Sequence, residues 1–147
     1  MPPVQTTYAG GMAPAFEGQI AAMEPGGILS RVIASDDGIG FGRPVFQGGS
    51  DHAIAATGTV FRGVTVVDHF PTVNAAGDLH PKGDTVSVMQ RGTVWVRATG
   101  AITAGAAAFL TGAGRFTATA ADGTAIPAVF DSSAADGQLV KLTLNLP

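Results

Sequence analysis

The chain contains no cysteine among its 147 residues, and it carries few charges. Without cysteine, the fold uses neither a disulfide nor a thiolate-bound metal, and redox chemistry gives no indication of the compartment. Charged residues make up 13% of the chain, about half of the usual share of roughly 25%. A surface with so few charges is easily buried against another protein. The composition therefore favours a protein that works in an assembly.

The basic residues are also dispersed along the sequence. Binding to a phosphate backbone depends on clustered positive charge, and the eight lysines and arginines form no run. We therefore expect no nucleic-acid partner. No stretch approaches the ~20 apolar residues of a membrane-spanning helix, and the N-terminus lacks the features of a secretory signal. We expect a soluble protein that is made in the cytoplasm and has no membrane partner.

Glycine (21 residues) and proline (9 residues) separate short apolar runs throughout the chain. That pattern is typical of strands joined by turns, and no segment sustains the 3.6-residue apolar period of a helix. In the last run, apolar and polar residues alternate, as in a sheet with one solvated face. The predicted fold is all-β: one small β-sandwich or barrel, between which the pattern does not choose. The predicted strands span residues 28–33, 44–47, 60–67, 85–90, 93–97, 107–111, 115–119, 125–130 and 139–146.

Three local features refine this prediction. Strands 85–90 and 93–97 both alternate and flank Arg91–Gly92, which predicts a hairpin with a two-residue turn. Gly63 lies inside a β-branched run and indicates a bulge or a close backbone approach. Pro127 cannot donate a ladder hydrogen bond, so its strand is expected at an edge or a bulge.

Residues 1–27 differ from the rest of the chain. They are rich in proline, glycine and alanine, and the one helix-prone stretch, 18–24, stops at Pro25. We predict an extended N-terminal arm (1–27) followed by a β domain (28–147); a terminus without fixed structure is the alternative. The polar loop 68–83 is long for a compact domain and is a second candidate contact surface. The arm carries isolated large apolar residues: Tyr8, Met12, Phe16, Ile20 and Met23.

No constellation in the sequence specifies an active site. The glycine-rich stretch 38–43 has G-x-G-x-G spacing in place of G-x-G-x-x-G, and Pro44 and a short strand follow it where a dinucleotide-binding loop requires a helix. We therefore predict a turn or loop there. His52, His69 and His80 match no metal-ligand spacing, so we expect exposed loop histidines instead of a metal site. We predict no catalytic residue, no cofactor and no metal.

Two glutamates and the single tryptophan are further candidates for chemistry. Glu17 and Glu24 lie in the predicted arm, where burial would not raise a carboxyl pKa for acid catalysis. Trp95 is expected to be a core or interface aromatic, with a carbohydrate platform as the alternative.

Several segments resemble the structural cement proteins that decorate the capsids of tailed phages. The similar stretches are residues 39–48, 61–64, 79–92, 105–111 and 126–130. The resemblance implies a jelly-roll-like β domain that binds the outside of an assembled capsid and holds neighbouring capsomers together. It also implies the major capsid protein as partner, a location on the capsid exterior of the virion, and a homo-oligomer, a dimer in preference to a trimer.

Within this resemblance the arm acquires a role, because an extended segment can lie along a partner or add a strand to its sheet. The expected capsid contacts are Tyr8, Met12 and Phe16. Deleting residues 1–24 is expected to leave the β domain folded and to abolish shell binding. The alternative function is a carbohydrate- or receptor-binding β-sandwich module of a virion.

Overall fold

The fold is seen in a computed structural model, which describes residues 15–68 and 79–147. In this part of the chain the secondary structure consists of strands and one 3-10 helix, which confirms the all-β prediction. The elements are β1 (Gly27–Ile33), β2 (Ile39–Gly40), β3 (Pro44–Gln47), β4 (Ala53–Ala55), β5 (Phe61–Thr65), β6 (Leu79–His80), β7 (Thr85–Thr99), β8 (Ala107–Thr111), β9 (Phe116–Thr117), η1 (Ala120–Asp122), β10 (Gly123–Phe130) and β11 (Leu139–Asn145).

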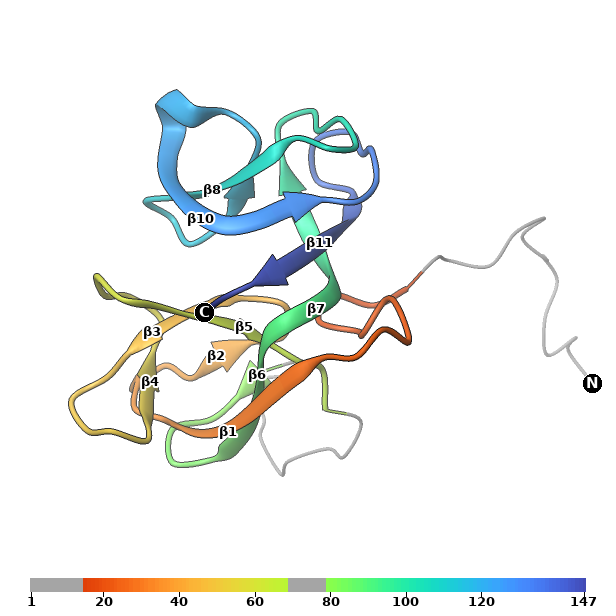
Figure 1. The fold of residues 1–147 in the computed structure, drawn as a ribbon. Coiled ribbons are helices and arrows are strands. Elements are labelled where there is room, and N and C mark those ends of the chain that lie inside the picture. Colours follow the sequence, from red (N-terminus) through yellow and green to blue (C-terminus); the bar gives the residue numbers. More distant parts are fainter. Residues whose placement is uncertain (1–14, 69–78) are drawn as a thin grey trace, which may run out of the picture.

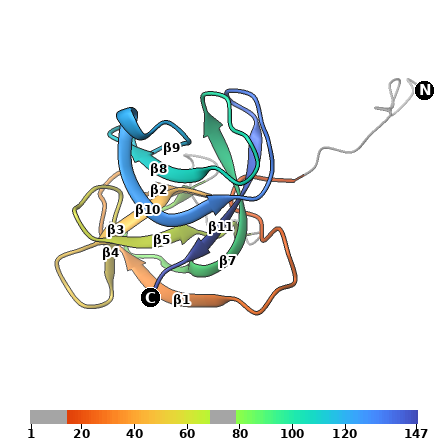
Figure 2. The same ribbon diagram turned by 45° about the horizontal axis from the view of Figure 1, so that its top comes forward.

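The main sheet closes on itself twice. Its strand order is β1-β4-β3-β5-β7-β11-β10-β8-β9, and β7 pairs in addition with β1 and with β9. Strands β1, β4, β3, β5 and β7 thus form one closed ring, here called the N-terminal ring. Strands β7, β11, β10, β8 and β9 form a second closed ring, the C-terminal ring (Figure 1, Figure 2). The arrangement is barrel-like, and this strand order does not confirm the jelly roll that the family resemblance implied.

Strand β7 belongs to both rings and changes direction between them (Figure 1). It pairs with β1 and β5 in its first half and with β11 and β9 in its second half. The predicted hairpin at Arg91–Gly92 is therefore wrong. A two-residue type I′ turn needs positive φ at both central residues, and among the described residues only glycines have positive φ. Gly92, with φ +123°, instead provides the irregular point within one continuous strand.

Alternating side chains fill the two rings. In β11, Val140, Leu142 and Leu144 are buried whereas Asn145 is exposed, as the alternation predicts. The core of the C-terminal ring continues through Phe116 and Phe130, both almost inaccessible to solvent. A second cluster lies in the N-terminal ring and consists of Ile33, Ile39, Val45, Ile54, Val86 and Val88.

The two predicted backbone irregularities are confirmed. Gly63 has φ +133°, and a Cβ atom there would lie 2.3 Å from the carbonyl oxygen of Met89, closer than any non-bonded carbon approaches. Pro127 lies where the register of β10 against β8 shifts, between Ala125 and Val129. Glycine and proline both weaken a regular ladder of hydrogen bonds, and here each of them lies where the ladder is irregular.

Some short elements were not predicted. Strands β2, β4 and β6 have only two or three residues each, too few for an alternating pattern to register. The helix-prone stretch 18–24 is not helical, and it contains an isolated bridge between Ile20 and Val94. Within residues 15–68 and 79–147, no helix has the length and apolarity needed to cross a membrane.

Candidate functional site: the base of the N-terminal arm

The described part of the predicted arm lies against the second half of β7. We call residues 15–26 the arm base. The Gly18 amide donates to the Trp95 carbonyl at 2.7 Å, the Trp95 amide donates to Gln19 at 2.9 Å, and the Ala21 amide donates to Thr93 at 2.8 Å. The arm base therefore adds a short antiparallel segment to the strand that the two rings share.

Two glycines allow the arm base to approach the domain closely. A Cβ atom on Gly18, which has φ +85°, would lie 2.7 Å from the Gly42 nitrogen and 2.9 Å from the Val67 nitrogen. A Cβ atom on Gly42, with φ +64°, would lie 2.7 Å from the Gly18 nitrogen. Only glycine fits these positions without displacing backbone. The glycine-rich stretch 38–43, predicted as a turn or loop, thus forms part of the surface that the arm base contacts.

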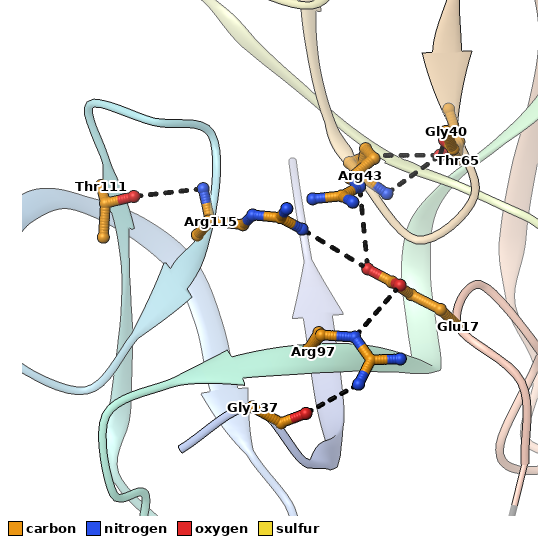
Figure 3. Close-up of polar contacts among 8 residues, drawn as sticks. All are labelled: Glu17, Gly40, Arg43, Thr65, Arg97, Thr111, Arg115 and Gly137. Atoms are coloured by element: carbon orange, nitrogen blue, oxygen red, sulfur yellow. Dashed lines mark hydrogen bonds and ion pairs between the residues drawn. The ribbon is translucent and has the colours of Figure 1, made fainter. Parts of the chain in front are cut away.

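Glu17 is the charged centre of this contact (Figure 3). Its carboxylate faces Arg97 Nε at 3.4 Å, Arg43 Nε at 3.7 Å and Arg115 Nη1 at 3.9 Å. The Glu17 side chain is 20% exposed, and the three arginine side chains are 30–47% exposed. The expectation that Glu17 lies on an arm without burial is therefore wrong: the side chain is largely covered by the domain.

The three arginines come from different parts of the fold. Arg43 directly precedes β3 of the N-terminal ring, Arg97 belongs to β7, and Arg115 directly precedes β9 of the C-terminal ring. One carboxylate facing three guanidinium groups leaves a local formal charge of +2 (3 − 1) in a chain of net charge −3. A single residue of the arm base thus links both rings electrostatically, and three of the eight basic residues that are dispersed in the sequence meet in space.

Neighbouring polar contacts hold this cluster in place (Figure 3). Arg97 Nη1 donates to the Gly137 carbonyl at 2.7 Å. The Arg43 amide donates to Thr65 Oγ1 at 3.0 Å, and that hydroxyl donates to the Gly40 carbonyl at 2.7 Å. These bonds hold the Arg97 guanidinium and the backbone at Arg43 in place independently of Glu17.

The second glutamate of the arm base has a different partner. The Thr93 hydroxyl donates to Glu24, and Thr93 Oγ1 lies 2.9 Å from Thr143 Oγ1. The side chain of Glu24 thereby adds a polar contact to β7 where the arm base crosses it.

Large apolar side chains are exposed on the arm base. Phe16 is 66% exposed, Ile20 is 44% exposed, and Met23 is fully exposed. Of the expected capsid contacts, only Phe16 lies within the described chain; Tyr8 and Met12 lie outside it. Exposed apolar side chains that gather on one segment are typical of a binding surface.

The histidine prediction is wrong for His80. This side chain is 3% exposed, its Nε2 lies 3.1 Å from the Val66 carbonyl oxygen, and its ring contacts the edge of Phe41 at 4.7 Å between centroids. His80 is therefore not an exposed loop residue; it is a buried residue of β6 and packs next to the end of β5. His52 is exposed, and His69 lies outside the described residues. In those residues no three histidine or acidic side chains converge as metal ligands would.

Trp95 is half-buried in the middle of β7, opposite the buried Val94 and Val96. The ammonium group of Lys141 lies 5.5 Å from the centre of its ring, a cation–π contact. The carbohydrate platform at Trp95 stays a prediction, and one of its ring faces already has a cationic neighbour.

Solved structures with the same fold come from phage particles. A chain of the capsid of Myoviridae phage XM1 matches with a TM-score of 0.68 and 12% identity, over 94% of this chain and 94% of that one. The N base of the head fiber gp8.5 of bacteriophage phi29 matches with a TM-score of 0.50 and 19% identity, over 80% of this chain and 94% of that one. A comparison with curated proteins finds no significant match. The fold is thus one that phage structural proteins use.

Sequence comparison assigns the family within that class. Residues 4–145 match the family described as structural cement protein (E217 gp24/Pam3 gp6). The chain belongs to this family of structural cement proteins, and the resemblance noted from its sequence is confirmed. The match begins at residue 4, ahead of the described residues, and spans both rings.

Proposed function

We propose that this protein is a cement protein that binds the outer surface of an assembled phage capsid and stabilises the contacts between capsomers. Its partner is the major capsid protein, its place is the exterior of the virion after synthesis in the host cytoplasm, and it acts without catalysing a reaction. Family membership supports this proposal. The observation that carries it furthest is the Glu17 cluster, which fixes the base of an apolar arm at the junction of the two rings.

The arm then serves as the capsid-binding element, with Tyr8, Met12 and Phe16 as contacts. A binding segment loses less conformational entropy on docking when its point of attachment is already ordered. Fourteen residues in fully extended form would reach at most about 50 Å from their point of attachment. Many copies on one shell add avidity to a weak individual contact.

A truncation tests the arm. The deletion removes residues 1–14, because residues 17–21 bond to β7 and to the arginines and their loss would perturb the domain. We expect the truncated protein to keep its thermal unfolding midpoint and to lose binding to shells. The assay is co-sedimentation with undecorated expanded capsids and, separately, with unassembled capsid protein.

Point variants refine this test. Phe16→Ser removes an exposed aromatic of the arm base, and Val60→Ser, at a position 55% exposed elsewhere, is the matched control. The proposal is supported if the protein binds shells but not unassembled capsid protein, and if Phe16→Ser weakens this binding whereas Val60→Ser does not. Equal shell binding by the truncated and full-length proteins would show that the arm is not the binding element, and absence of binding by the full-length protein would refute the cement function.

A further inference from the structure

One edge of the main sheet is open. Strand β1 has a neighbour on both sides only at its end. Strand β4 pairs with Val32 and Ile33, whereas β7 pairs with β1 from Gly27 to Val32. The segment Gly27–Arg31 therefore has β7 on one side and, among the described residues, no strand on the other.

The direction of the backbone groups along this edge follows from the bonds at its end. The Val32 amide donates toward β4, to the His52 carbonyl, at 2.8 Å, and the Ile33 amide donates to Asp84, ahead of β7, at 3.0 Å. Because successive residues of a strand point their backbone groups to opposite sides, Ser30 and Ile28 direct theirs to the open side. The Ser30 carbonyl accepts Arg31 Nη1 at 2.8 Å on the exposed surface, a bond that a backbone amide would replace.

The side chains of this edge are apolar and exposed. Ile28 is 43% exposed, Val32 is 37% exposed and Leu29 is 36% exposed. Soluble proteins usually protect an open edge with proline, charged side chains or a covering loop; β1 contains no proline or lysine, and its one charged residue is Arg31. Next to it, Ile28 lines a hollow of about 370 Å³ with Ile20 and Met89. The open edge thus continues into the apolar arm base.

We propose that β1 pairs with β1 of a second copy of this chain, antiparallel and about a two-fold axis. This inference rests on the homo-oligomeric part of the proposed function and specifies its surface. In the proposed register the two-fold axis passes through Leu29. Ile28 of each copy then lies opposite Ser30 of the other copy, so that both outward-facing residues of each strand have partners. The same register sets Arg31 against Gly27, so that no like charges face each other across the axis.

The self-complementary register favours a second copy over an unrelated strand as occupant. An interface about a two-fold axis must match a surface with itself, and the apolar side chains of β1 meet that condition without a charged clash. A five-residue strand pair with its flanking side chains buries less than the ~1,200–2,000 Å² of a standard stable interface. Dissociation on dilution is therefore expected, and the assembled shell would hold the pair together by avidity.

Cysteine cross-linking tests the register. The natural chain has no cysteine, so Leu29→Cys introduces a single thiol at the two-fold axis. In a non-hydrogen-bonded antiparallel pair the Cα atoms are ~4.5 Å apart, within the ~4.4–6.8 Å that a disulfide spans. We expect mild oxidation to convert Leu29→Cys to a covalent dimer at least tenfold faster than Val60→Cys, an exposed position outside the edge.

Sedimentation velocity of the full chain at several concentrations supplies the second measurement. Ser30→Pro removes an outward donor that the β1–β7 ladder does not use, so it should preserve the unfolding midpoint and shift the protein to monomer. A wild-type dimer that Ser30→Pro dissociates and Leu29→Cys traps supports the inference.

Each contrary result has a distinct meaning. A wild-type protein that is monomeric at every concentration overturns both the dimer and its surface. A dimer that persists in Ser30→Pro and leaves Leu29→Cys uncross-linked uses another surface, which overturns this inference and leaves the homo-oligomer in place. Shell binding is measured separately by co-sedimentation, so failure of the cement function would not be mistaken for failure of the β1 pair.

Discussion

Replacing Glu17 by glutamine removes one charge from the centre of three arginines and leaves the shape of the side chain almost unchanged. The carboxylate has nitrogen neighbours at 3.4, 3.7 and 3.9 Å. Ion pairs of this exposure contribute about 0.2–1 kcal/mol each. The total for the three pairs, including the unrelieved repulsion among the arginines, is about 1–2 kcal/mol of unfolding free energy. For a chain of this length, that corresponds to a lowering of Tm by about 2–8 °C.

Differential scanning calorimetry at two ionic strengths measures this effect. Asp51→Asn, at an exposed position before β4, removes the same formal charge and is the matched control. The Debye length falls from about 30 Å at 0.01 M salt to about 3 Å at 1 M, so the difference in Tm between wild type and Glu17→Gln should shrink at high salt. An equal Tm for Glu17→Gln and Asp51→Asn, or a difference that salt does not change, would show that the electrostatic account of the cluster is wrong.

Two further predictions concern single residues elsewhere in the fold. Gly63→Ala should lower the unfolding free energy by about 2–4 kcal/mol in denaturant titrations, because its Cβ would collide with the Met89 carbonyl oxygen, whereas Gly112→Ala, which meets nothing within 4 Å, should change it little; equal effects would refute the close approach. Hydrogen bonding and attraction from Lys82 hold the pKa of Asp36 below its ordinary value, so the ion pair contributes above the ordinary pKa and is lost as pH falls through the lowered one. Carboxyl NMR titration should show this shift and its disappearance in Lys82→Met; an Asp36 that titrates alike in both proteins contradicts it.

Much of the sheet was predictable because most strands are long enough to show their pattern. The β-branched run around Gly63 and the alternating run at the C-terminus predicted β5 and β11 close to their observed bounds. The hairpin failed because alternation on both sides of Gly92 is equally compatible with a turn and with one bent strand. Only the pairing partners of β7, which lie far apart in the sequence, decide between the two.

The candidate site was largely hidden from sequence reasoning. Arg43 lies 54 residues before Arg97 (97 − 43), and Arg115 lies 18 residues after it (115 − 97). No local spacing connects the three arginines with Glu17. The only available signal was an acidic residue directly before Gly18 in an otherwise uncharged stretch. Charge partners across a closed sheet depend on topology, which single-sequence patterns do not contain.

The two hydrophobic clusters of this chain suggest two folding units, but the sharing of β7 argues for one. A unit that unfolds by itself must release its own strands without disturbing its neighbour. Here the fifteen residues of β7 complete both rings, so that opening either ring removes the central strand of the other. The protein should therefore unfold in a single cooperative transition, and a substitution that destabilises one ring should destabilise the other as well.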